Sequence, residues 1–176
     1  MSNAVTFDAL SPSSIENAIK QIQNYRQSLN EKATRLAQRI AEEVAWSASA
    51  GFSTAPADDI IGQSGFASGD VTVTVESDGA IQIVMASGPD AVFLEFGAGV
   101  YYNGAAGSSP HPKGAELGFL IGEYGQGYGR RNVWAFPGEG GEMVLTHGTP
   151  ASMPMYHGLE NVLTIITDLA REVFAA

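Results

Sequence analysis

The side chains best suited to chemistry in this sequence are the three histidines, His111, His147 and His157. No two of them stand four residues apart on a helical face, and no cluster of acids accompanies them, so their spacing does not predict a metal site. Ser152 lies between two of the histidines but lacks the glycine-flanked turn that exposes a nucleophilic serine. We therefore expect no bound metal, and we expect each histidine to be structural or exposed.

A glycine-rich segment is the second candidate, as a phosphate-binding loop. Gly125, Gly127 and Gly129 alternate with other residues, but no lysine-serine or lysine-threonine pair follows them. No strand leads from them directly into a helix, as phosphate loops require. The adjacent Arg130 and Arg131 could contact phosphate, but two arginines in an acidic chain are more often salt-bridge partners, for example at a subunit contact. The sequence therefore predicts no cofactor.

Two short motifs stand out from the rest of the chain, and the first covers residues 93–102. An apolar element ends here in glycines that permit a sharp backbone turn. Glu95 is the single acid among these apolar residues. A half-buried carboxylate needs a hydrogen-bond partner, and a backbone N–H or an arginine would serve. The motif predicts a turn held by a satisfied acid.

The second motif covers residues 146–156 and joins an expected strand to an expected helix. Pro150 and Pro154 stiffen the connection, and Pro154 suits the first turn of the helix because its missing N–H is not needed there. Ser152 is the expected N-cap, since a serine side chain can accept from the first free amides. The motif predicts a strand-to-helix transition.

The elements that position these motifs begin with a long amphipathic helix, expected from about residue 12 to about residue 49. Apolar residues recur there at steps of three and four, which keeps them on one helical face. Pro12 suits the first turn, and Ser13 with Glu16 has capping-box spacing. At 1.5 Å per residue the helix would be roughly 55 Å long. A small domain cannot cover such a helix unless the helix kinks or packs on another subunit.

After a loop over residues 50–69, alternating valines predict a strand over 71–76 and a hairpin turn at Asp78-Gly79, of type I′. Alternating isoleucines predict the return strand. Residues 91–96 form either a short helix or a third strand. Residues 97–141 are expected to be mostly irregular and rich in glycine and aromatics, which indicates a binding or assembly segment. Residues 143–146 are expected as a last strand before a C-terminal helix, whose expected apolar face consists of Leu159, Val162, Ile166, Leu169 and Val173.

Composition bounds the classes of function. The chain has 176 residues, 44% hydrophobic and 16% charged, with a net charge of −10 and no cysteine. Five of the nine bases lie in the first 39 residues, and none lies between Ile40 and Pro112. This distribution disfavours a general nucleic-acid binder. The sequence has no apolar run long enough for a membrane span and no signal-peptide pattern, so we expect neither a membrane span nor secretion.

Taken together and in order, these segments resemble the HK97 gp10-like family of tailed-phage tail-completion and neck proteins. Glu95-Phe96-Gly97 is similar to the glutamate-phenylalanine-glycine motif of the family, with Ala98 where threonine is common. Residues 146–155 resemble its later threonine-, glycine- and proline-containing stretch, and residues 124–134 resemble versions from phages of Gram-positive hosts. The long helix and the hairpin also fit, so the resemblance covers residues 12 to 174.

The resemblance implies an α+β domain over residues 12–176, preceded by an extended arm over 1–11, in which a small antiparallel sheet packs against the long helix and the C-terminal helix. It implies a homo-oligomeric ring, expected to be a hexamer, at the head–tail junction of the virion after assembly in the host cytoplasm. The partners would be a head–tail connector or head-closure protein and a tail terminator or tail tube protein. DNA would pass through the lumen without specific binding, and acids from the stretch between residues 40 and 112 could line it.

The resemblance implies no catalytic residue. Residues expected to stabilise the domain or its assembly contacts are Glu95, Phe96, Gly97, Tyr101, Tyr102, Arg130, Arg131, Trp134, Thr146, Gly148, Pro150 and Pro154. The alternative is a small cell-wall-directed hydrolase encoded by a phage, with an acid such as Glu95 or Glu123 at work. Tail completion, tail termination and head closure are not separated by the sequence. An interaction module of the toxin or antitoxin kind has no motif in its favour.

Overall fold

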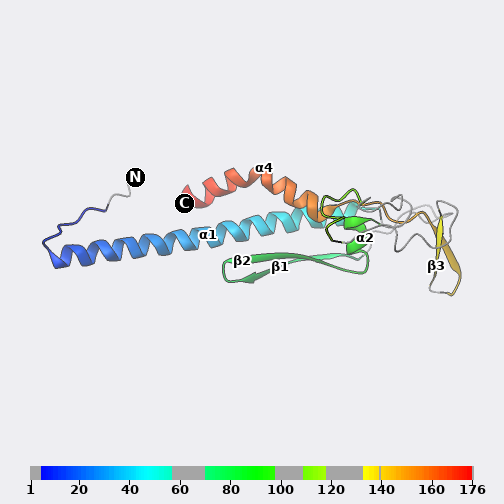
Figure 1. Cartoon of the computed structure of the whole chain (residues 1–176), viewed down its shortest axis with the longest axis horizontal. Coiled ribbons are helices and arrows are strands. Elements are labelled where there is room, and N and C mark those ends of the chain that lie inside the picture. Colours follow the sequence, from blue (N-terminus) through cyan, green and yellow to red (C-terminus); the bar gives the residue numbers. More distant parts are fainter. Residues whose placement is uncertain (1–4, 57–69, 98–108, 118–132, 139, 176) are drawn as a thin grey trace.

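The computed structural model describes residues 5–56, 70–97, 109–117, 133–138 and 140–175. Its fold class is α+β, as predicted: a long N-terminal helix and a C-terminal helix accompany small antiparallel sheets (Figure 1). The elements in chain order are α1 (Pro12–Thr54), β1 (Thr72–Asp78), β2 (Ile81–Ser87), α2 (Ala91–Phe96), β3 (Trp134–Pro137), β4 (Met143–Thr146) and α4 (Pro154–Ala175).

Helix α1 runs for 43 residues and ends later than its expected end near residue 49. Its N-cap is Ser11, whose Oγ accepts from the N–H of Ser14 at 3.4 Å, while Pro12 takes the first helical position. The capping box expected at Ser13 and Glu16 is therefore wrong, because Pro12 already fits the first turn and moves the cap one residue upstream of it. The helix ends where Ala55 becomes extended, a conformation favoured before a proline.

Strands β1 and β2 form the expected hairpin, with Asp78 opposite Ile81 and Val73 opposite Ala86. Because Asp78 belongs to the ladder, the two loop residues are Gly79 and Ala80, not the predicted Asp78-Gly79 pair. Only Gly79 has a positive φ, of 61°, whereas a type I′ turn needs two. The pattern is that of a type II′ turn, in which glycine occupies the first central position.

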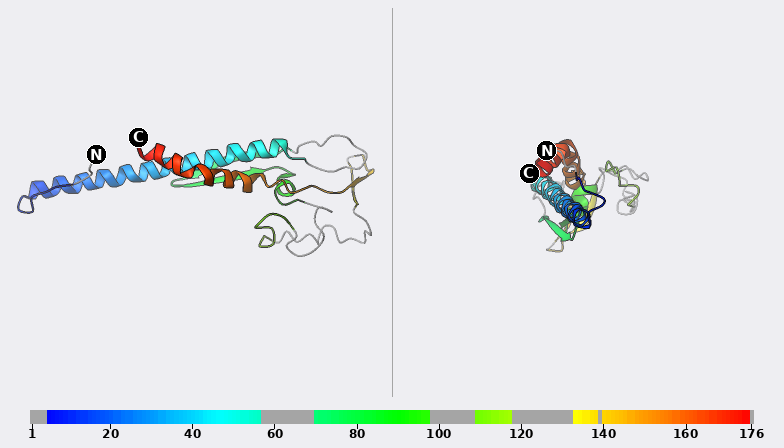
Figure 2. Two further views of the ribbon diagram at one scale, coloured as in Figure 1. Left: turned by 90° about the horizontal axis from the view of Figure 1, so that it is seen from above. Right: turned by 90° about the vertical axis from the view of Figure 1, so that its left-hand side faces the viewer.

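The principal packing is between α1 and α4, which lie side by side in both views (Figures 1 and 2). Small residues allow the close approach. A Cβ added to Gly51 would lie 2.9 Å from Cβ of Pro154, and one added to Gly158 would lie 3.0 Å from the carbonyl oxygen of Val44. The expected apolar face of α4 is confirmed in part, since Val162, Leu169 and Val173 are buried, whereas Leu159 is 48% exposed.

The buried core gathers at the C-terminal end of α1. Ala48, Phe52 and Ala55 pack there with Leu94 of α2. The inner face of the hairpin and Met155 of α4 cover this cluster. Burying a large apolar side chain contributes about 1.5–3 kcal/mol, so Phe52 and Leu94 anchor α2 and the start of α4 to the long helix.

The N-terminal half of α1 projects beyond the hairpin and α4 (Figures 1 and 2). Its apolar residues Ile19, Ile22 and Tyr25 are each about half exposed. Helix α1 is thus longer than its own chain covers over the described residues, as the sequence predicts.

One further strand lies where the sequence predicts irregular chain. β3 pairs with β4, and Trp134 stands opposite Thr146. The alternation of apolar and polar residues does not predict this strand, because it has only four residues and contains Pro137. The strand expected at residues 143–146 is confirmed, and residues 91–96 form a helix, one of the two expected states. No helix in the described part of the chain combines the length and apolarity needed to cross a membrane.

Candidate functional site

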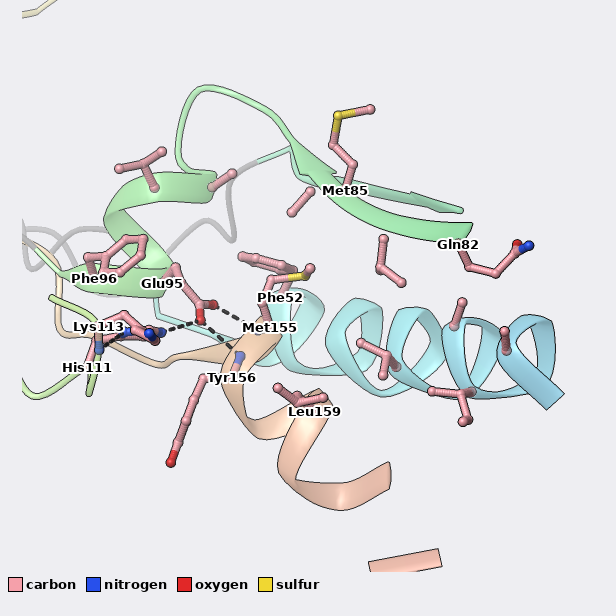
Figure 3. A pocket seen from close by; sticks show the side chains of 18 residues that line it. Phe52, Gln82, Met85, Glu95, Phe96, His111, Lys113, Met155, Tyr156 and Leu159 are labelled. Atoms are coloured by element: carbon pink, nitrogen blue, oxygen red, sulfur yellow. Dashed lines mark hydrogen bonds and ion pairs between the residues drawn. The ribbon is translucent and has the colours of Figure 1, made fainter. Parts of the chain in front are cut away.

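The two sequence motifs meet at Glu95, on the last turn of α2 (Figure 3). Its Oε2 accepts from the backbone N–H of Met155 at 2.8 Å, and its Oε1 accepts from that of Tyr156 at 2.9 Å. These residues lie 60 and 61 positions along the chain. The backbone N–H partner expected for this carboxylate is confirmed.

The contact caps helix α4. The carbonyl of Met153 accepts from the N–H of His157 at 2.9 Å, which makes Met153 the N-cap and Pro154 the first helical residue. Met155 and Tyr156 are then the second and third residues, whose amides have no partner inside the helix. The first turn of α4 holds no acid of its own. Glu95 supplies both the acceptors and the negative charge that a helix N-terminus favours.

Ser152 is therefore not the cap, contrary to the expectation from its position. Its backbone N–H donates to the carbonyl of Leu94 at 2.8 Å, and that of Met153 donates to the same carbonyl at 3.2 Å. Met153 reaches this geometry with a φ of 49°, in the left-handed region. Of residues 152–156, only Pro154 lacks an N–H, and every other amide donates to Leu94 or Glu95. The second motif is thereby bound to the first through its backbone.

His111 completes the coordination of the carboxylate. Its Nε2 lies 3.1 Å from Oε1 of Glu95, and its Nδ1 accepts from the N–H of Lys113 at 3.0 Å. Because Nδ1 accepts, the neutral ring carries its proton on Nε2 and donates it to Glu95. The imidazole packs against Phe96 and Tyr156, with centroids 4.4 and 5.4 Å apart. It is 8% exposed, so a buried acid and a buried histidine satisfy each other.

Residues 109–117 hold His111 in place. The Oγ of Ser109 donates to the carbonyl of Phe96 at 2.9 Å and accepts from the N–H of His111 at 3.3 Å. Gly114 lies against this serine, where a Cβ would approach Ser109 Cβ to 2.6 Å. At the turn itself, Gly97 has a φ of 80° and closes α2 through its N–H to Phe93. The glycine is required there because the turn needs the left-handed region.

The remaining expected site residues divide into two groups. Thr146 is buried, and its Oγ1 accepts from the N–H of Gly148, which has a φ of 97°. Pro150 is half-buried, and Pro154 is buried against α1. Tyr101, Tyr102, Arg130 and Arg131 lie outside the described residues, as do Glu123 and the segment 125–129. Trp134 belongs to β3, but its side chain is outside the described part.

Sequence reasoning missed Ser109 and the pairing of His111 with Glu95. Nothing in the local pattern of residues 109–113 points to an acid 16 positions upstream. The available signal was indirect, because an acid among apolar residues requires a hydrogen-bond donor that the local sequence does not identify. The histidine fits the structural role expected for it.

An open apolar groove of about 820 Å³ adjoins the buried pair (Figure 3). Ala41 and Val44 of α1, Val84 of β2 and Leu159 of α4 contribute to its walls, and Glu95 and His111 lie at its edge. Both carboxylate oxygens of Glu95 already accept hydrogen bonds, and the residue is only 6% exposed. Glu95 and His111 therefore form part of the groove wall, but the carboxylate is not available to a bound molecule. No group of three potential metal ligands occurs among the described residues.

A second polar group lies on the exposed side of α4. Nδ1 of His157 is 3.0 Å from Oε2 of Glu160. Hydrogen bonds from His157, and then from Tyr156, hold the pKa of the Glu160 carboxyl below its usual value. The same contact with Glu160 raises the pKa of the Tyr156 phenol. The ionised Glu160 therefore stabilises the folded chain at pH values above the ordinary pKa of a glutamate. This stabilisation is lost as the pH falls through the lowered pKa of Glu160 in the folded chain. It is small, because these groups are exposed.

Comparison with known proteins gives no match. No family model, no curated protein and no solved structure is similar to this chain at a significant level. A function is therefore inferred from the fold, the contacts of Glu95 and the sequence motifs.

Proposed function

We propose that this chain is a structural subunit of the head–tail junction of a tailed phage, a tail-completion or neck adaptor that forms a ring between the tail tube and the head connector. The observation that carries the proposal is the projecting half of α1, whose apolar face its own chain leaves exposed. A folded chain that presents such a face is suited to assembly with neighbours. A sixfold ring would match the tail tube.

The arrangement around Glu95 supports a structural role for both motifs of the resemblance. The glutamate-phenylalanine-glycine turn and the proline-containing loop form one unit, in which the acid of the first caps the helix that the second begins. A net charge of −10 would let DNA pass through a lumen without adhering. The connector or head-closure protein on one side and the tail terminator or tail tube protein on the other are the proposed partners.

The hydrolase alternative draws no support from Glu95. A general acid or base must reach a substrate proton, and this carboxylate is buried with both oxygens engaged. The two functions separate in an assay of peptidoglycan turnover by the parent chain and by Glu95→Gln. Turnover by the parent that the substitution abolishes would support the hydrolase and defeat the proposal.

The direct test is genetic. In a phage that encodes this chain, deletion of its gene should leave filled heads and tails that do not join, or tails that remain unfinished, as seen by electron microscopy of the lysate. Expression of the chain in trans should restore complete virions. Normal numbers of complete, infectious particles without the gene would contradict the proposal.

A further inference from the structure

The first surface of interest is an uncovered face of α1, here named the α1 stripe, made of Ile15, Ile19, Ile22, Arg26 and Leu29. Steps of three and four place these residues on one face of the helix. Ile15 and Leu29 are each 37% exposed and Ile22 is 56% exposed, values high for residues of this kind. The α1 stripe lies on the part of α1 that projects beyond α4 and the hairpin.

The second surface is the outer face of the β1–β2 hairpin, here named the hairpin face. Ile81, Ile83 and Met85 form one row of it and are 63%, 48% and 40% exposed. Met85 points away from α1 in Figure 3. The register sets a second row beside the first, with Asp78 opposite Ile81, Glu76 opposite Ile83 and Thr74 opposite Met85. The hairpin uses its other face to pack on the core, which leaves this one free.

The two surfaces complement each other in charge. Arg26 lies within the apolar α1 stripe, and the hairpin face carries Glu76 and Asp78, with no base anywhere in residues 70–97. Within the described ranges, none of these three side chains forms a hydrogen bond or ion pair through its charged group. Opposite charges set in matching apolar surfaces favour one partner and one register.

The hairpin face is shorter than the α1 stripe, so it covers only part of the stripe. The α1 stripe spans 14 residue steps, or about 21 Å at 1.5 Å per residue. The exposed row of β2 spans four steps, or about 13 Å. They cannot meet within one chain, because the hairpin packs through its inner face on the C-terminal half of the same helix. The occupant of each surface must come from another molecule, and the acids of the hairpin face disfavour a nucleic acid there.

We propose that the α1 stripe of one copy packs on the hairpin face of a second copy, with Arg26 of one opposite Glu76 and Asp78 of the other. The contact joins two different surfaces, so each copy can bind one neighbour through its α1 stripe and another through its hairpin face. Repetition of this contact closes into a ring when the rotation between neighbouring copies allows. It assigns the hairpin acids to the contact between copies and not to the wall of a DNA channel. The inference deepens the proposed function, since it identifies the contact that would build the ring.

The test is a charge exchange in the full-length chain, read by sedimentation velocity and native mass spectrometry. The parent should self-associate. Arg26→Glu and Glu76→Arg should each weaken self-association at least about tenfold, because each places like charges at every contact. Mixing the two variants in equal amounts should restore assembly, since every contact between unlike copies again pairs opposite charges. Lys20→Glu makes the same change of charge away from the α1 stripe and should behave as the parent.

Circular dichroism of each variant establishes that it is folded. Folded single variants that assemble as the parent does, or a mixture that stays dissociated, would overturn the proposed contact, as would a parent chain that is monomeric at every concentration. The head–tail role is tested separately by the gene deletion. If rings survive both charge reversals, the proposed contact is wrong but the head–tail role is unaffected. If mixing restores assembly while virions form normally without the gene, the contact is supported but the head–tail role is wrong.

The absence of cysteine from the chain permits a second readout. Ile22→Cys, one helical turn from Arg26, and Ile83→Cys, beside Glu76, can be prepared separately, mixed and oxidised. A disulfide-linked dimer containing one copy of each variant is the expected product. The control is a mixture of Ile83→Cys with Leu163→Cys, since Leu163 is exposed on α4. This mixture should give little disulfide-linked dimer. Equal cross-linking in both mixtures would argue against the contact.

Discussion

At the scale of single residues, Glu95 connects three parts of the chain. Glu95 itself lies on α2, and its buried carboxylate caps α4 and accepts from His111. A buried charge is tolerated only where donors replace its lost hydration. The residue therefore acts as a structural centre whose loss would leave the first amides of α4 without partners.

Glu95→Gln tests this role with almost no change of shape. The amide keeps one acceptor oxygen, but its NH₂ group must face an N–H of Met155 or Tyr156. We expect the free energy of unfolding to fall by about 1–3 kcal/mol, measured by urea denaturation. Glu116→Gln, which removes an exposed acid paired with Lys113, is the matched control and should cost less than about 0.5 kcal/mol. Equal midpoints for both variants would contradict the buried cap.

The tautomer of His111 is a second prediction at this scale. Since Nδ1 accepts from the N–H of Lys113, the neutral ring should carry its proton on Nε2. Long-range ¹H–¹⁵N correlation spectra should show this form for His111. His157 lies exposed beside Glu160 and provides an internal comparison. A neutral His111 with its proton on Nδ1 would be incompatible with the hydrogen bonds described.

At the scale of elements, α1 is the support on which the rest is assembled. Its C-terminal half carries the hairpin on one side and α4 on another. The approach of α4 depends on Gly51 and Gly158, where side chains would meet the facing helix. Close contact at these points sets the start of α4 within reach of Glu95. The site is thus a consequence of helix packing as well as of its own hydrogen bonds.

Gly158→Leu should separate α1 from α4. A Cβ at this position already lies 3.0 Å from the carbonyl oxygen of Val44, so a larger side chain must push the helices apart. Overpacking of this kind costs about 1–3 kcal/mol, and thermal unfolding followed by circular dichroism would measure the loss. Thr167→Leu places the same side chain on the exposed side of α4 and should change stability little. Equal stability of the two variants would refute the close packing.

At the scale of the whole molecule, the chain divides into a packed end and a projecting end. The buried cluster, Glu95 and the groove all lie along the C-terminal half of α1, whereas the α1 stripe lies on its other half. Such a division suits a subunit whose projecting half is stabilised by a neighbour. Folding and assembly should then be separable in experiment.

Removal of residues 1–29 should separate them. Because the deleted segment contributes little to the packed end, we expect its unfolding temperature to change by only a few degrees. Self-association should be lost, as measured by sedimentation velocity. We expect the parent to form a ring and the truncated chain to be a monomer. Collapse of the packed end after this deletion would contradict the division.

The sequence by itself determined the features that depend on local periodicity. The spacing of three and four along α1, the alternating valines of β1 and the prolines before α4 each repeat within a few residues, so they predict two helices and a hairpin. The acid of residues 93–102 also required a donor on physical grounds alone. What local patterns left open were details decided by neighbours, such as the cap at Ser11 and the turn at Gly79-Ala80.

Only the tertiary structure decided which groups Glu95 meets. Met155, Tyr156 and His111 lie far from it along the chain, and no local pattern records a contact across such a separation. The same reason hid β3, whose four residues are held by pairing with β4 and not by their own periodicity. Packing of α4 on α1 brings the two motifs together, and the free energy of burying Leu94 and Phe52 makes that arrangement persist.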